Sequence, residues 1–248
     1  MTPSISHRIM SKYAASLGVA ILVLAQPALS AADLTLQFND FDSGGSTVPA
    51  LGIPDGSPAG ISDTRLVSGT GIAAIGSLRV GLEISGGFIG DLYAYLRYEN
   101  GSDAAFSVLL NRLGRSAANP LGGPNAGLNL SLRDDATDNA HDYLSVGPVP
   151  PPGDPVAGEW QPDGRNIDPG SSGAIFDATS PSTPLSGFNG FGADGEWTLF
   201  VADMSSGVAH QVESWSLTIV PVPEPAHAGV VLMVLGGWWA IRRARRRE

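Results

Sequence analysis

Apolar and polar residues alternate with a period of two in several separated segments of this chain. In residues 77–85 the apolar positions are Leu78, Val80, Leu82 and Ile84. The same alternation recurs in residues 92–98, 128–133, 197–201 and 214–219. A period of two is typical of strands that bury one face. Glycine, proline, asparagine and aspartate lie between these segments, so the pattern predicts an all-β, antiparallel sandwich or barrel.

Two stretches of the chain do not have the pattern of a strand. Residues 115–126 are rich in asparagine, proline and glycine, and residues 147–185 contain nine prolines. Proline and glycine break regular elements and favour turns. We therefore expect two long loops, and loops of this length are either functional or poorly ordered.

The N-terminus has the pattern of a secretory signal peptide. Arg8 and Lys12 precede an apolar stretch over residues 14–25, and small residues follow at Ala28, Ser30, Ala31 and Ala32. This order predicts a signal peptide over residues 1–32, with cleavage near Ser30 or Ala32 and a mature chain that starts around Asp33. The alternative is an N-terminal anchor that is not cleaved.

The C-terminus has the pattern of a membrane anchor. Residues 226–241 contain no charge unless His227 is protonated. As a helix they would reach roughly 24 Å, a little less than a hydrocarbon core of about 30 Å. Two tryptophans and a basic tail over residues 242–248 would flank the membrane, with the tail in the cytoplasm: Trp238, Trp239, Arg242, Arg243, Arg245, Arg246 and Arg247. The alternative is a buried core helix.

A short motif precedes the apolar segment. Val222-Pro223-Glu224-Pro225, one hydrophobic helix and a basic tail follow one another in that order. Residues 221–248 thus resemble the PEP-CTERM sorting signal of Gram-negative bacteria. The resemblance implies that an exosortase recognises and cuts the tail. It also implies that the protein spans the membrane once, with its body outside the cytoplasm, and reaches the cell surface or the extracellular space after processing.

The charge of the body differs from that of the whole chain. Between Asp33 and Pro225 there are 23 acidic residues and seven arginines, whereas the full chain has a formal net charge of −10. This excess of negative charge argues against nucleic acid or an anionic polysaccharide as a simple electrostatic partner. The chain has no cysteine. Its stability must therefore come from a packed core, for which about 190 residues suffice.

The strand segments of the body appear in a recognisable order. Its two most specific stretches are Gly195-Glu196-Trp197-Thr198-Leu199-Phe200-Val201-Ala202-Asp203 and Ser214-Trp215-Ser216-Leu217-Thr218-Ile219. Residues 53–220, within a domain over residues 33–220, resemble the P domain (Homo B domain) of kexin- and furin-type proprotein convertases. The resemblance implies an eight-stranded antiparallel jelly roll that accompanies a subtilisin-type serine endopeptidase. Residues 205–212 depart from the family, because they lack its Gly-Asp turn.

The sequence predicts no catalytic residue. A subtilisin-type catalytic domain needs an Asp, a His and a Ser on a large α/β domain, for which the body has no room. Its histidines before the sorting motif are His141 and His210, and neither is near a Gly-x-Ser-x-Gly motif. We interpret each as a histidine whose ring nitrogens have hydrogen-bond partners or as an exposed surface residue. Resemblance to a domain that accompanies a protease does not by itself confer protease activity.

Two possible ligand sites follow from the sequence. Asp134, Asp135, Asp138 and Asp142 form the densest group of carboxylates, and closely spaced acidic oxygens suit Ca²⁺. The resemblance to P domains, in which the Asp-Asp-x-Ala turn after this strand recurs, implies Asp134 and Asp135 as the ligand pair. The alternative is that these acids are solvated or cap turns, as Asp91 and Asp203 could at the ends of their strands. Trp160, in the second long loop, is the one credible exposed aromatic for binding sugar, whereas Trp197 and Trp215 fall on inward faces.

These patterns together predict a non-catalytic, exported β-sandwich protein that an exosortase sorts to the cell surface or to extracellular polysaccharide. Nucleic acid is not expected as a partner. Two alternatives stay open at this point. One is a carbohydrate-binding module, and the other is an accessory P domain of a separate serine endopeptidase.

Overall fold

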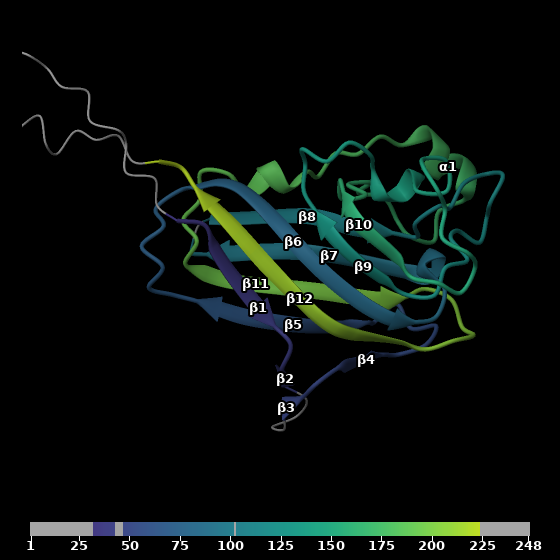
Figure 1. Cartoon of the computed structure of the whole chain (residues 1–248), viewed down its shortest axis with the longest axis horizontal. Helices are drawn as coiled ribbons and strands as arrows, with labels where there is room; N and C mark the ends of the chain where they lie inside the picture. Colours follow the sequence, from purple (N-terminus) through teal and green to yellow (C-terminus); the bar gives the residue numbers. More distant parts are fainter. Residues whose placement is uncertain (1–31, 43–46, 102, 224–248) are drawn as a thin grey trace, which may run out of the picture. The chain divides into compact units, whose positions relative to one another are not determined.

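Residues 32–42, 47–101 and 103–223 are described by the computed structural model, and most of them lie in strands or short connections (Figure 1). The strands are β1 (Leu34–Phe38), β2 (Phe41–Asp42), β3 (Thr47–Val48), β4 (Leu51–Ile53), β5 (Ile61–Val67), β6 (Ile75–Gly86), β7 (Leu92–Asn100), β8 (Asp103–Asn111), β9 (Leu128–Leu132), β10 (Val156–Trp160), β11 (Gly195–Asp203) and β12 (His210–Pro221). The helical turns are η1 (Ile89–Asp91), η2 (Ala140–Asp142), α1 (Gly173–Ala178) and η3 (Leu185–Phe188).

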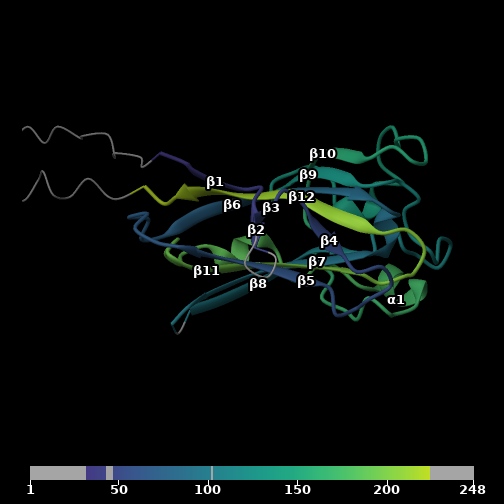
Figure 2. The ribbon, with the colours of Figure 1, turned by 90° about the horizontal axis from the view of Figure 1, so that it is seen from below.

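The strands form two stacked sheets, which confirms the predicted β-sandwich (Figure 2). One sheet has six strands in the order β1-β12-β6-β9-β10, and β4 also pairs with β12. The other has four strands in the order β5-β11-β7-β8. Strands β2 and β3 form a separate small hairpin. The predicted alternation is typical of this architecture, because each strand turns one face to the space between the sheets.

The core contains the inward residues of the strands that the alternation predicted. Leu78, Val80, Leu82 and Ile84 of β6 are all buried, and so are the inward residues of β7, β9, β11 and β12. Trp197 and Trp215 are fully buried, as expected for inward aromatic residues. The Trp197 indole N–H donates to the backbone carbonyl of Ala193 at 3.0 Å, so burial leaves no polar atom of this side chain unpaired.

Two expectations about the sheets need correction. Strand β10 pairs with β9 in parallel, from Val156 opposite Leu128 to Trp160 opposite Leu132, so the six-stranded sheet is mixed rather than wholly antiparallel. The 147–185 segment is also not simply a loop, because it contains β10, α1 and the start of η3. A parallel pair needs a long crossover, and residues 133–155 provide it. The 115–126 segment contains no strand or helix, as expected.

The first and last strands lie side by side. Strand β1 pairs antiparallel with β12, with Leu34 opposite Ile219 and Phe38 opposite Trp215. Strand β4 continues along the same edge of β12, with Ile53 opposite His210. The start of β1 and the end of β12 therefore meet at one end of the sandwich, whereas α1 lies at the other end (Figure 1).

The predicted membrane helix lies outside the described residues, as do residues 1–31 of the predicted signal peptide. Within the part of the chain that the structure describes, no helix is long and apolar enough to cross a membrane.

Candidate functional site

The sorting motif begins where the last strand ends. Strand β12 ends at Pro221, and Val222 and Pro223 follow it as exposed residues. The Val222 N–H donates to the backbone carbonyl of Ala74 at 2.9 Å, which holds the chain against the sandwich up to this position. The rest of the motif, Glu224 and Pro225, and the flanking residues from Trp238 to Arg247 lie outside the described residues.

The two predicted calcium ligands point to different partners. Asp134 follows β9, and its carboxylate accepts the backbone N–H groups of Leu185 at 2.9 Å and Ser186 at 2.6 Å. It therefore caps the first turn of η3, which is the capping alternative raised from the sequence. Asp135 is 3.5 Å from the Nε atom of Arg133, and its side chain is 80% exposed. Calcium binding by this pair stays a prediction.

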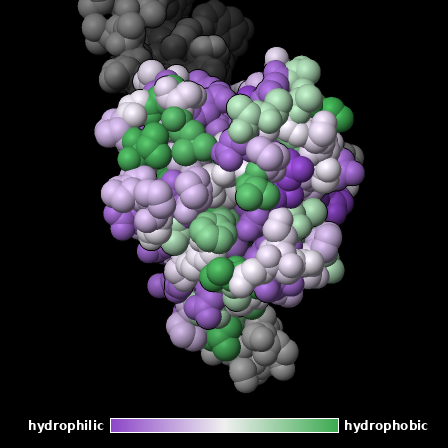
Figure 3. Space-filling model, turned by 90° about the vertical axis from the view of Figure 1, so that its right-hand side faces the viewer, coloured by the Kyte–Doolittle hydropathy of each residue, from purple (hydrophilic) through white to green (hydrophobic). Residues whose placement is uncertain are grey.

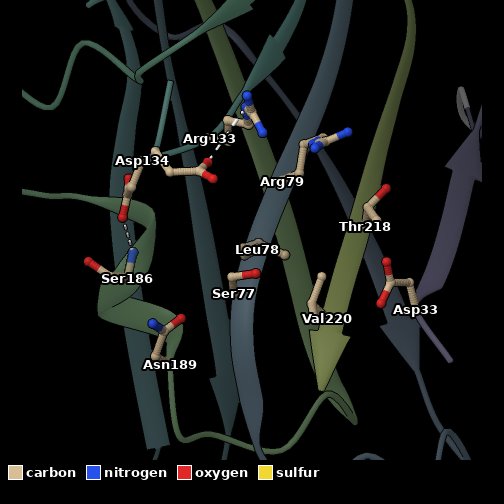
Figure 4. A pocket seen from close by; sticks show the side chains of 11 residues that line it. Asp33, Ser77, Leu78, Arg79, Arg133, Asp134, Ser186, Asn189, Thr218 and Val220 are labelled. Carbon is tan, nitrogen blue, oxygen red and sulfur yellow. Dashed lines mark hydrogen bonds and ion pairs between the residues drawn. The ribbon is translucent and has the colours of Figure 1, made fainter. Parts of the chain in front are cut away.

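Asp134 and Asp135 line a shallow pocket of about 400 Å³ on the six-stranded sheet (Figure 4). Asp134 turns toward Ser186 on one side of the pocket, and Asp33 lies on the opposite side. Arg133 and Arg79 both lie near Glu159, at 2.9 and 3.8 Å. Both arginines of the pocket thus have Glu159 as a partner, and the three aspartates that line it leave an excess of negative charge. Among the described residues, no group of three or more His, Asp or Glu side chains is arranged to hold a metal ion.

His141 is buried, and both of its ring nitrogens are in use. Its Nδ1 is 2.6 Å from the fully buried carboxylate of Asp163, and its Nε2 is 2.9 Å from the backbone carbonyl of Arg115. Each ring nitrogen thus has a hydrogen-bond partner from another segment of the chain. Arg165 also contacts Asp163, at 3.3 Å. His141 is therefore a satisfied histidine, and neither nitrogen is free to activate a nucleophile.

His210 belongs to a second buried cluster, in the turn where the sequence departs from the P-domain pattern. Its Nδ1 is 2.9 Å from Asp203, whose other carboxylate oxygen accepts the Ser205 N–H at 3.0 Å. Its Nε2 is buried and has no hydrogen-bond partner among the described residues. A Cβ atom at Gly87 would come within 2.1 Å of the His210 ring, so only glycine fits beside it. His210 is therefore neither the satisfied nor the surface histidine that the sequence predicted, because it is buried and one of its ring nitrogens has no partner among the described residues.

Asp91 and Arg112 form an ion pair next to this cluster, with the Arg112 Nη2 atom 3.2 Å from the Asp91 carboxylate. Burial raises the pKa of the Asp91 carboxyl, although Ser205 and the Arg112 charge oppose this effect. Burial likewise lowers the pKa of Arg112, and the nearby Arg115 charge adds to that shift. Arg112 also has a φ of 51°, a left-handed conformation that is rare outside glycine. Its guanidinium bonds to Gly90 and Ser205 fix it there.

Trp160 is not the exposed loop aromatic that the sequence predicted. It ends strand β10, is half-buried, and packs against the hydrophobic core. Its indole N–H donates to the Ala157 carbonyl at 3.1 Å. Part of the Trp160 ring stays exposed, and sugar binding at this residue stays a prediction.

No family model matches the chain, and no curated protein matches it. Among solved structures, it is similar to the serine protease of Aeromonas sobria, with a TM-score of 0.40 and 16% identity over 77% of this chain and 27% of that one. It is also similar to the complex of that protease with its chaperone ORF2, with a TM-score of 0.38 and 17% identity over 79% and 28% of the two chains. The chain thus spans little more than a quarter of those proteins.

Sequence reasoning missed an aromatic cluster on the outer face of the four-stranded sheet. Tyr95 and Phe200 stack with their ring centres 4.8 Å apart, and Phe106 and Tyr93 lie beside them. The alternation in β7 predicts that Tyr93 and Tyr95 lie on the face away from the core, and this pattern could have indicated the cluster. The buried Asp163 had no such signal, because it lies in a proline- and glycine-rich stretch with no periodicity.

Proposed function

We propose that this chain is a non-catalytic β-sandwich protein that is exported and then sorted to the cell surface or extracellular matrix. In this proposal an exosortase processes the C-terminal signal over residues 221–248, and the body stays outside the cytoplasm. The observation that carries the proposal is where the fold begins and ends. Its first strand starts at Leu34, just after the predicted signal peptide, and its last strand ends at Pro221, just before the Val222–Pro225 motif.

This placement means that neither signal is needed to complete the described sheets. Strand β1 starts just after the expected cleavage site near Ser30 or Ala32, and it pairs along its whole length with β12. The sorting motif starts one residue after β12. Removal of residues 1–32 and of the tail would leave every described strand and its partners intact. This is what the proposed processing requires.

We also propose that the body has a fold like that of P domains. The Gly195–Asp203 motif forms the whole of β11, which lies between β5 and β7. The Ser214–Ile219 motif lies inside β12, which lies between β6 and the β1 edge. The two motifs that carry the resemblance thus form interior strands of the two sheets. We propose a jelly-roll domain of this kind, without protease activity of its own.

A topology experiment tests the proposal. One tag is inserted in the exposed loop at Gly153 and another is added after Glu248, and both are probed with protease in intact cells. We expect the first tag to be accessible from outside and the second to be protected until the tail is removed. An exposed C-terminal tag, or an internal tag that stays protected, would contradict the proposed topology. Replacement of Pro223, Glu224 and Pro225 by alanine should retain the uncut chain in the membrane.

An accessory role beside a separate protease gives a different result. If the domain accompanies a subtilisin-type endopeptidase, such an enzyme should co-purify with the tagged chain from its own host. Recovery of the chain alone, without peptidase activity, would favour the surface protein proposed here.

A further inference from the structure

Arg115 is exceptional among the arginines of this acidic domain. Each of the other six has a carboxylate within 4 Å: Arg65, Arg79, Arg97, Arg112, Arg133 and Arg165. Arg115 has none among the described residues, although this part of the chain is rich in acids. Its Nε atom is buried without a hydrogen-bond partner. A guanidinium has five N–H donors, and leaving them unpaired costs free energy unless a ligand or water accepts them.

The Arg115 side chain is held in place by a stack of rings. Its guanidinium lies over the Phe176 ring, with the Cζ atom 5.7 Å from the ring centre. Phe176 is buried and stacks in turn on His141, with the ring centres 5.5 Å apart and an interplanar angle of 9°. His141 also holds the Arg115 backbone through the carbonyl at 2.9 Å. The arginine is thus preorganised, and preorganisation reduces the entropy cost of binding.

This guanidinium lines a pocket of about 370 Å³ between η2, α1 and the 114–119 loop. Ser116 and Ser145 contribute hydroxyl groups to its wall. The Ser116 Oγ accepts the Asn119 N–H at 3.0 Å, so its own hydrogen remains available to a ligand. An arginine with free donors and a nearby hydroxyl suits a carboxylate, which accepts several hydrogen bonds at once.

The two acids of the pocket narrow the class of ligand. Asp142 is 3.6 Å from Arg165, and the Asp177 carboxylate accepts the Ala117 N–H at 3.0 Å. Both side chains still offer free carboxylate oxygens, which attract hydrogen-bond donors and repel a ligand that is negative all round. A uronic acid has the matching groups, since its ring carries one carboxylate and several hydroxyl donors. Inorganic sulfate has no hydrogen-bond donor.

We propose that this pocket binds the carboxylate of a uronic acid residue in an acidic saccharide, with Arg115 as its main contact. Because the net charge of the body is negative, this binding depends on hydrogen bonds from the Arg115 guanidinium at the site and not on the overall charge of the domain. The pocket adjoins α1, at the end of the sandwich opposite the meeting point of β1 and β12 (Figure 1). Figure 3 looks onto this end, where polar areas separate several hydrophobic ones. The extracellular polysaccharide as the source of the saccharide rests on the proposed function, whereas the site itself does not.

Calorimetric titration of the full chain in a neutral detergent tests the proposal. The probes are trigalacturonate and trimannuronate, their neutral counterparts galactotriose and mannotriose, and sodium sulfate. We expect at least one uronate to bind, and the neutral sugars and sulfate to bind at least roughly tenfold more weakly, because a hydrogen-bonded charge contributes that much. Equal binding of acidic and neutral sugars, stronger binding of sulfate, or no binding of either uronate would overturn the proposal.

Variants connect the binding to Arg115. Arg115→Ala should weaken uronate binding at least roughly tenfold, and Arg115→Lys, which keeps the charge but loses the planar fork, should weaken it less. Arg97→Ala is the matched control, because Arg97 is exposed and already paired with Glu99 on β7. Unchanged affinity in either Arg115 variant, with an unchanged melting temperature, would refute the role of Arg115. Because this titration does not depend on export, a negative result leaves the topology experiment intact, and a wrong topology leaves the binding result intact.

Discussion

Leu34 lies opposite Ile219 in the six-stranded sheet, so the first residue of the first strand is paired near the end of the last strand. This pairing brings both ends of the fold to one end of the sandwich. A domain with this arrangement can lose a leader and a tail without losing a strand. Both predicted signals would then adjoin the same end of the sandwich, and α1 and its pocket lie at the other end.

Trp215 and Trp160 differ in burial, so we expect alanine substitutions at the two positions to lower stability by different amounts. Trp215 is fully buried, and its indole N–H donates to Asp63 at 2.7 Å. We expect Trp215→Ala to lower the free energy of unfolding by about 3–5 kcal/mol, because a large core side chain leaves a cavity. Trp160→Ala should cost less, since Trp160 is half-buried at the end of β10. Urea unfolding measures both, and an equal or larger loss for Trp160→Ala would contradict this assignment.

Asp134 can be tested as a cap and as a calcium ligand in one experiment. Loss of the cap in Asp134→Ala should lower stability by about 0.5–2 kcal/mol, the usual range for a side chain that accepts backbone N–H groups. A capping role predicts the same loss in calcium and in chelator. Scanning calorimetry of the wild type and the variant under both conditions is the measurement. A melting temperature of the wild type that rises with calcium, but not in Asp134→Ala, would show that Asp134 binds the ion.

Asp194 should make stability depend on acid pH. Its carboxylate accepts hydrogen bonds from the Thr70 hydroxyl at 2.5 Å, the Thr70 N–H at 3.0 Å and the Gly69 N–H at 2.8 Å. The Thr70 bonds above all lower the pKa of Asp194 below its usual 3.8. A depressed carboxyl pKa stabilises the fold above the unfolded value and loses that effect as the pH falls through the folded value.

The matched variant for this effect is Asp194→Asn, which keeps the shape but not the charge. We expect it to be less stable than the wild type at pH 7, and the difference in stability to shrink when the pH falls below about 3.8, the usual pKa of an aspartate carboxyl group. Denaturant midpoints at pH 7 and pH 3 measure this. A difference that stays constant between the two pH values would contradict the assignment to the ionised carboxylate.

The alternation predicted β6, β7, β9, β11 and β12 because each of these strands buries one face. The alternation did not predict strand β8, because Val108, Leu109 and Leu110 are all fully buried and do not alternate with polar residues. The Asp163 N–H donates to the Leu109 carbonyl at 3.0 Å, so a distant segment covers the edge of this strand. The alternation did not predict strand β10 either, because three of its five residues are exposed. Its parallel pairing with β9 depends on a long crossover, which a local pattern does not indicate.

Some features of the candidate sites could be predicted from local sequence motifs, whereas others depend on contacts between distant segments. Local motifs predicted that the C-terminal signal follows the fold and that Trp197 and Trp215 lie in the core. The partners of Asp134 and His141 come from segments 22 or more positions away in the chain, which no local pattern encodes. The unpaired state of Arg115 is likewise a property of the folded domain, because it depends on where every nearby carboxylate lies.

The mass of the mature chain shows directly whether both predicted signals are removed. The protein is recovered from the surface or medium of the cells that produce it, and intact mass spectrometry locates both of its ends. We expect a chain that starts around Asp33 and ends within or near Val222–Pro225, without residues 226–248. A recovered chain that still contains residues 1–32 or residues 226–248 would contradict the proposed processing.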